Sequence, residues 1–127
     1  MKIGGYRIPA EILPHYYHKR GAVGMARYDE GNPNRLSSSH DFYIVQGHPH
    51  SPEELEATIQ EYKLDLSPKR KKEYLTQGGA PNLDQQYTVF GEVIEGIEVV
   101  DSIAAVPVDK QHWPLKDVPM KVKIVQQ

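Results

Sequence analysis

The stretch that most constrains the fold is residues 83–105, LDQQYTVFGEVIEGIEVVDSIAA, in which two hydrophobic periods follow one another. In its first half, apolar residues alternate with small or polar ones and include β-branched and aromatic types, which predicts a strand over residues 88–95. In its second half, apolar residues recur at helical spacing, which predicts a helix over residues 97–105 that ends before Pro107. Gly96 lies between the two periods, so the stretch should form a strand, a turn and a helix.

Three further segments show the two-residue alternation of a strand. They are residues 21–27, residues 41–46 and residues 119–125, the last of which sets apolar residues against lysines. One face of residues 21–27 carries only small residues, which allows a second backbone to approach closely. That face could belong to a tightly packed wall or to the floor of a peptide groove, and both readings stay open. We expect the core to contain Phe42, Ile44, Phe90, Val93 or Ile94, Val100, Ile103 and Ile124.

Residues 47–79 have helical rather than strand patterning. Ser51, the proline after it and a glutamate three residues on form a capping box, which predicts a helix over residues 52–63. A second Ser-Pro pair predicts a helix over residues 68–76, with Gly78 as its stop. We interpret the segment as a helical hairpin that lies over the strands.

Composition narrows the class of protein. A length of 127 residues with 39% hydrophobic and 25% charged residues is typical of one globular domain, residues 1–127. The formal net charge of −2 argues against a nucleic-acid partner. No apolar run approaches the roughly 20 residues of a membrane span, and residues 1–13 lack a signal-peptide core. We expect a cytoplasmic protein if Met1 is the native start, and the cell envelope is an option if an upstream segment was removed.

Histidine pairs raise the question of a metal site. His15 and His18 are three residues apart, and His48 and His50 flank a proline. No further Cys, His or carboxylate lies at a recognised ligand spacing, so the sequence predicts no metal site. It also has no Gly-rich phosphate loop and no Gly-x-Ser-x-Gly elbow, so we expect no cofactor.

Three segments, in the family's order, resemble the cyclophilin-type peptidyl-prolyl isomerases. Residues 83–96 are similar to Leu-Asp-Gly followed by Val-Phe-Gly-x-Val-x-x-Gly. Residues 20–26 are similar to Gly-x-x-x-Met-Ala, and residues 41–45 to a strand that usually reads Ser-Gln-Phe-Phe-Ile. Residues 6–11, 17–20 and 117–125 read like the bacterial branch. The resemblance implies a mostly β fold with some helix, a cyclophilin-like antiparallel β-barrel.

Part of the family pattern has no counterpart in this chain. The segment that carries Phe-His-Arg, with the family's catalytic arginine, and the Gln motif beside it find no match. We therefore expect a barrel truncated to about half its strands, with residues 47–79 as a helical insertion. The open strand edges of such a sheet could be satisfied by a second copy, by the helical hairpin or by an N-terminal piece supplied from elsewhere. We favour a homo-oligomer, with an intertwined dimer as its form.

The resemblance also implies a set of substrate-binding positions. Tyr43, Leu83 and Tyr87 match positions that line the family's proline pocket. Asp41 stands where the family has a substrate-binding glutamine, and Arg27 where it often has asparagine. The catalytic residue is unknown because the family arginine is absent, and Arg27 is the only candidate. The complete predicted set is Met25, Ala26, Arg27, Asp41, Tyr43, Leu83 and Tyr87.

Two functions follow from these expectations. Prolyl isomerisation needs no nucleophile, because its barrier of ~20 kcal/mol is amide resonance that is lost when the imide nitrogen becomes pyramidal. The first function is therefore an isomerase acting on Xaa-Pro bonds, which is weak because a missing preorganised donor lowers a rate by ~10²- to 10³-fold. The alternative is a non-catalytic module that binds proline-containing polypeptides or assembles through its open strand edges.

Overall fold

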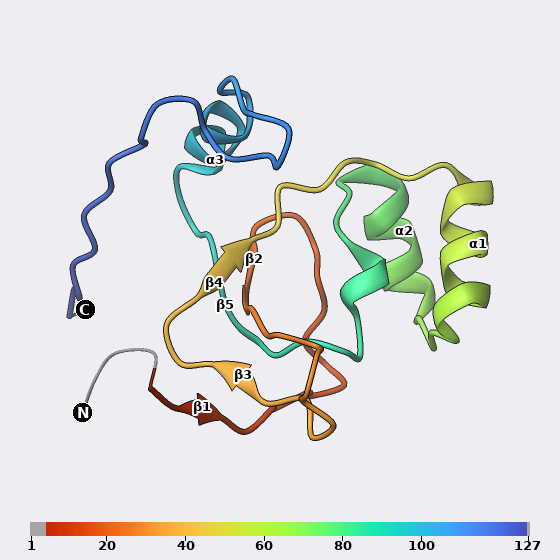
Figure 1. Ribbon diagram of the computed structural model, residues 1–127. Helices are drawn as coiled ribbons and strands as arrows, with labels where there is room; N and C mark the ends of the chain where they lie inside the picture. Colours follow the sequence, from red (N-terminus) through yellow and green to blue (C-terminus); the bar gives the residue numbers. More distant parts are fainter. Residues whose placement is uncertain (1–4, 127) are drawn as a thin grey trace.

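The computed structural model describes residues 5–126 and has a mixed α/β architecture (Figure 1). A three-stranded antiparallel sheet has the order β4-β2-β5, with β2 at Ala22–Met25, β4 at Phe42–Ile44 and β5 at Val89–Glu92. A second antiparallel pair joins β1 (Arg7–Ile8) to β3 (Ser37–Ser38). The helices are α1 (Pro52–Tyr62), α2 (Pro68–Thr76), α3 (Ile97–Ala104) and the 3₁₀ helix η1 (Pro81–Leu83). Within residues 5–126 the strands form no closed barrel, and no helix is long and apolar enough to cross a membrane.

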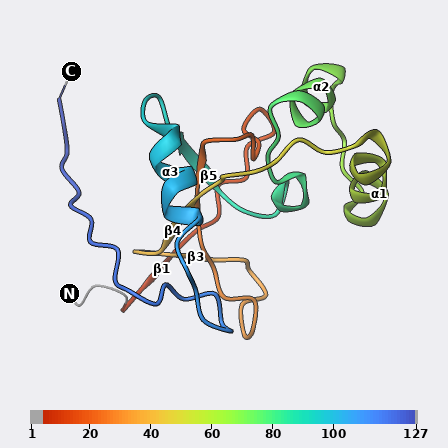
Figure 2. The same ribbon diagram turned by 90° about the horizontal axis from the view of Figure 1, so that it is seen from above.

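Most of the predicted elements are confirmed. Strands lie within the predicted residues 21–27, 41–46 and 88–95, each shorter than expected, and the three helices match their predicted bounds to within one residue. The predicted strand at residues 119–125 is wrong, because this segment runs extended past the sheet without pairing to it (Figures 1 and 2). A strand needs a neighbouring backbone to satisfy its N–H and C=O groups, and alternation alone supplies none.

The main buried cluster lies at the helical pair α1 and α2, while on the sheet side only Ala22 and Val45 are buried apolar residues. Leu55, Leu64, Leu66 and Tyr74 form this cluster, with Tyr17 packed against them. The predicted core is therefore largely wrong, since only two of its candidates, Val93 and Val100, are even half-buried. The exposed members are Phe42, Ile44, Phe90, Ile94, Ile103 and Ile124, the last 97% exposed.

Register explains this exposure. Val23 pairs with Ile44 and Met25 with Phe42, so these four apolar side chains share one face of the sheet, and within the described residues no layer buries it. The pairing of β2 with β5 shifts between Val23 and Gly24, which makes Phe90 the extra residue of a bulge. The alternation correctly predicted the strands, but it does not tell whether another layer covers the apolar face of the sheet.

The helical pair forms for the local reasons that the sequence indicates. The backbone N–H of Glu54 donates to Ser51 Oγ at 3.1 Å, and the N–H of Ser51 donates to Glu54 Oε2 at 2.9 Å, which completes the capping box. That accepted bond lowers the pKa of Glu54 below its ordinary value. The helices α1 and α2 pack on each other, and α1 packs on η1, so the expectation that the hairpin lies over the strands is wrong (Figures 1 and 2).

Candidate functional site

Two tyrosine rings lie together where the resemblance places the proline pocket. Tyr43 pairs with Gly24 of β2, and a Cβ atom on Gly24 would lie only 2.4 Å from the Tyr43 hydroxyl oxygen. A glycine is therefore required for this ring to lie across the neighbouring strand. The ring of Tyr87 meets that of Tyr43 edge-on, with centroids 6.2 Å apart and an interplanar angle of 83°. We call these two rings the tyrosine surface.

Arg27 is packed against this surface. Its guanidinium carbon lies 4.2 Å from the centroid of the Tyr87 ring, and its side chain is only 7% exposed. Its Nε donates to Asp29 Oδ1 at 3.0 Å, and its Nη1 donates to the Gln86 carbonyl oxygen. Two of its three nitrogen atoms are thus committed, so Arg27 fixes the Tyr87 ring more than it offers a cation to a ligand.

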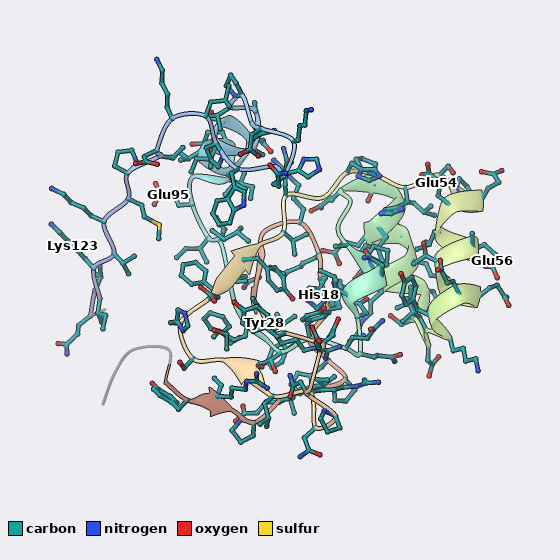
Figure 3. The ribbon with its side chains drawn as sticks, viewed as in Figure 1. His18, Tyr28, Glu54, Glu56, Glu95 and Lys123 are labelled. Carbon is teal, nitrogen blue, oxygen red and sulfur yellow. The ribbon has the colours of Figure 1, made fainter. Side chains whose placement is uncertain are left out.

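A buried hydrogen-bond network lies behind Tyr43. His18 lies between the strands and the helical pair (Figure 3) and is 1% exposed. Its ring stacks on the Tyr43 ring, with centroids 5.8 Å apart. Its Nδ1 lies 3.0 Å from Asp84 Oδ1 and its Nε2 lies 2.7 Å from the Tyr43 hydroxyl. Because a carboxylate only accepts, Nδ1 donates to Asp84, and in the tautomer with its proton on Nδ1 the Nε2 atom accepts from the Tyr43 O–H. This relay fixes the orientation of the Tyr43 ring.

Asp84 is the centre of that network. Its Oδ1 also accepts the backbone N–H of His18 at 2.8 Å, and its Oδ2 accepts the Tyr74 hydroxyl at 2.5 Å. Burial raises the pKa of Tyr74, with the Asp84 charge as the next cause, and burial likewise raises the pKa of Tyr43. Both hydroxyls therefore stay protonated at neutral pH and act as hydrogen-bond donors.

The remaining predicted residues are more widely spread. Leu83 ends η1 directly before Asp84, so the network sets its position. Ala26 acts through its backbone, since its N–H donates to the Asp41 carbonyl at 3.0 Å and its carbonyl accepts the Ser38 N–H at 2.8 Å. The Asp41 side chain is half-exposed, with Oδ2 3.4 Å from Ser38 Oγ.

The structure therefore groups some predicted residues and separates others. It brings Arg27, Tyr43 and Tyr87 into direct contact. It places Met25 opposite Phe42, on the sheet face away from Tyr43. Asp41 borders a hollow on that same far face rather than the tyrosine surface.

Sequence reasoning did not select His18, Asp84 and Tyr74 as site residues. His18 was considered only as a metal ligand beside His15, yet its ring belongs to the network with an aspartate 66 positions away. No spacing rule links residues so far apart. The one available signal was the Leu-Asp pair at positions 83 and 84, whose acid we treated as part of a motif rather than as an anchor.

Two hollows lie away from the tyrosine surface. One of about 410 Å³ is bordered by β4 and α3, with Phe42, Ile44 and Ile103 in its lining. The other, of about 570 Å³, lies between β5 and the lead-in segment that includes Leu13 and Tyr16. Neither is lined by the two tyrosines, so a ligand of the tyrosine surface would bind apart from both.

Comparison with known proteins decides the family. The family described as cyclophilin type peptidyl-prolyl cis-trans isomerase/CLD matches residues 1–124. The chain belongs to this family. The strand and turn motifs and the tyrosine surface can therefore be considered as parts of a cyclophilin-type chain.

Relatives of this cyclophilin-type chain bear isomerase names. A putative bifunctional phosphatase/peptidyl-prolyl cis-trans isomerase of Streptococcus pyogenes is 32% identical over 91% of this chain and 23% of its own length. A putative peptidyl-prolyl cis-trans isomerase of Staphylococcus saprophyticus is 43% identical over 43% of this chain and 28% of its own. The human peptidyl-prolyl cis-trans isomerase-like 3 is 47% identical over 38% of this chain and 30% of its own. The chain thus spans less than a third of the length of each of these relatives.

Proposed function

We propose that this chain binds proline-containing segments of polypeptides on the tyrosine surface and accelerates their Xaa-Pro isomerisation weakly. The observation that carries the proposal is the contact of Tyr43, Tyr87 and Arg27, three family positions that the fold brings into one place. Aromatic rings offer a proline ring apolar contact area, and the network through His18 holds Tyr43 in a fixed orientation. Leu83 at the end of η1 would extend the apolar contact.

We expect a weak isomerisation rate because the Arg27 guanidinium is already engaged by other partners. Isomerisation is accelerated when a positive group is aimed at the imide nitrogen, and Arg27 already uses two of its three nitrogen atoms on Asp29 and Gln86. No Phe-His-Arg motif is present in the sequence to supply another arginine. The absence of one preorganised donor lowers a rate by ~10²- to 10³-fold.

An isomerase assay on the full chain separates the two functions. We expect exchange NMR on a Xaa-Pro peptide to show a rate above the uncatalysed one, and Tyr43→Ala to return it to the uncatalysed value. The matched control is Tyr28→Ala, which removes a 68% exposed tyrosine and should leave the rate unchanged. Binding without acceleration would favour the non-catalytic module. If the chain shows neither peptide binding nor acceleration, both functions are rejected.

We further propose that the chain pairs with a second copy as an intertwined dimer. Both β4 and β5 are edge strands of the three-stranded sheet and present N–H and C=O groups on their outer sides. Beside them lie exposed Phe42, Ile44 and Ile103, which line the hollow of about 410 Å³. Edge pairing of two copies would extend the sheets toward a barrel-like closure and cover these side chains at the same time.

Sedimentation at micromolar concentration tests this pairing. We expect the chain to sediment as a dimer and Ile44→Lys to sediment as a monomer, because a charge would then have to be buried in the interface. Ile44 is 38% exposed in the single chain, so the variant should still fold. The control is Val125→Lys at an 81% exposed position, which should stay dimeric. A folded wild-type monomer at every concentration would eliminate the dimer.

A further inference from the structure

Two histidines and a glutamate meet where the chain enters α1. His48, His50 and Glu54 each present one ligand atom, and all three atoms lie within 4.8 Å of one another. The two imidazole rings stack with centroids 4.7 Å apart and an interplanar angle of 22°. Sequence spacing does not indicate the third ligand, because the chain must first turn at Ser51 before Glu54 faces back toward the histidines.

One ring nitrogen of His50 is hydrogen-bonded to the backbone, as is usual for a metal-bound histidine. Its backbone N–H donates to the Tyr74 carbonyl at 3.0 Å, and its ring Nε2 lies 3.3 Å from the Gly79 carbonyl oxygen. Because a carbonyl only accepts, Nε2 carries the proton and Nδ1 keeps its lone pair. Metal-bound histidines almost always donate their second ring N–H to a carbonyl or carboxylate in this way, which fixes tautomer and ring orientation.

The backbone around His48 is held just as closely. His48 forms an antiparallel bridge with Gly79. A Cβ atom on Gly78 would lie 2.3 Å from the His48 carbonyl carbon, so only glycine permits this approach. Pro49 fixes its own φ and restricts the residue before it. Both histidines therefore start from an ordered backbone, and little conformational freedom remains to be lost when a ligand binds.

Glu54 completes the donor set without leaving its helix. Its Oε2 accepts the Ser51 N–H at 2.9 Å in the capping box, which leaves Oε1 for a second partner. The carboxylate also offsets the positive end of the α1 dipole, which would otherwise disfavour a cation there. The cluster thus offers two nitrogen atoms and one carboxylate oxygen.

We propose that His48, His50 and Glu54 form a binding site for one Zn²⁺ ion, or for a similar divalent transition-metal ion, with water as the fourth ligand. Two histidines and one carboxylate are a recurrent tetrahedral zinc set, whereas Mg²⁺ and Ca²⁺ require oxygen ligands. Bond lengths of about 2.0–2.2 Å place neighbouring zinc ligands about 3.3 Å apart. The ligand atoms would therefore have to approach one another by up to about 1.5 Å, which exposed His48 and Glu54 can do by rotating their side chains.

The ion would tie the entry of α1 to the segment that precedes it. It would hold residues 48–50 against the first turn of the helix, at the same place where Gly78 and Gly79 cross the chain. This role is separate from the proposed isomerase function, because neither Tyr43 nor Tyr87 belongs to the cluster.

Calorimetric titration of the full chain, prepared without a histidine tag, tests the site with Zn²⁺. We expect one ion to bind per chain, and Mg²⁺ to give no binding. Glu54→Gln should weaken Zn²⁺ binding at least tenfold while it keeps the capping box, since glutamine serves at that position too. His50→Ala should weaken it as strongly. The matched controls are Glu53→Gln, in the same helical turn, and His15→Ala, and both should bind like the wild type.

Any one of three results overturns the proposal. The first is wild-type binding no tighter than that of His50→Ala. The second is equal affinity in the wild type and in Glu54→Gln, with circular dichroism showing that the variant keeps its helices. Loss of binding in Glu53→Gln as large as in Glu54→Gln would also contradict the three-ligand site, because it would indicate only a diffuse effect of charge.

Discussion

Asp84→Ala is expected to lower the free energy of unfolding by about 3 kcal/mol or more. The carboxylate accepts three hydrogen bonds in the interior, from the His18 backbone, the His18 ring and the Tyr74 hydroxyl. Removing it leaves each donor buried without a partner, and each such group costs about 1–3 kcal/mol. The variant also releases the histidine that holds Tyr43, so the tyrosine surface should lose its order together with the core.

Urea denaturation followed by circular dichroism measures this effect. The matched control is Asp65→Ala, at an exposed position between two buried leucines, which should change the free energy by no more than about 0.5 kcal/mol. The loss in the free energy of unfolding for Asp84→Asn should lie between those of Asp84→Ala and Asp65→Ala, because an amide keeps one accepting oxygen. A loss below about 1 kcal/mol for Asp84→Ala would show that the network does not hold this fold together.

Tyr43→Ala is expected to abolish binding of a Xaa-Pro peptide. The ring makes the edge-on contact with Tyr87 and lies across β2, so its removal takes away half of the apolar surface proposed to meet the proline. A central aromatic of a binding surface typically contributes 2 kcal/mol or more, roughly a thirtyfold change in affinity. An NMR titration of the full chain with the peptide measures this loss.

Tyr43→Phe is the variant that assigns the effect to the ring. It keeps the aromatic face and removes only the hydroxyl that donates to His18, so it should bind the peptide within a few-fold of the wild type. Its stability should fall by about 1 kcal/mol, because a buried acceptor on His18 loses its partner. Peptide affinity that is unchanged in Tyr43→Ala would rule out the tyrosine surface as the binding site.

The helices could be predicted because their signals are local. A capping box at Ser51, a Ser-Pro start for α2 and a glycine stop lie within a few residues of the ends that they define. The strands β2, β4 and β5 were also found from alternation, although not their shorter lengths. Local chemistry thus predicts where an element begins and ends when neighbouring residues determine it.

The core and the tail could not be predicted in the same way. Ile44 and Ile124 both belong to alternating patterns, yet both are exposed. Among residues 5–126, no layer buries the sheet face of Ile44 and no strand pairs with the segment of Ile124. Burial depends on a second layer or a second strand, which no pattern within the element reports. The tightest core instead formed around Tyr74 and its leucine neighbours beside the helices.

The residues of the candidate site were likewise predictable only in part. The resemblance supplied Arg27, Tyr43 and Tyr87, which the fold brings into contact. It did not supply His18, because a hydrogen bond between positions 66 apart leaves no trace in spacing or periodicity. The residues that would touch a ligand were therefore easier to find than those that hold them in place.

A chemical-shift map of the wild-type chain with a Xaa-Pro peptide tests the central claim most directly. The reference is the same peptide with alanine in place of proline. We expect the proline peptide, and not its alanine counterpart, to shift the resonances of Arg27, Tyr43, Leu83 and Tyr87. Shifts confined to residues 47–79, or to the hollow between β5 and the lead-in segment, would contradict the account, and so would identical maps for the two peptides.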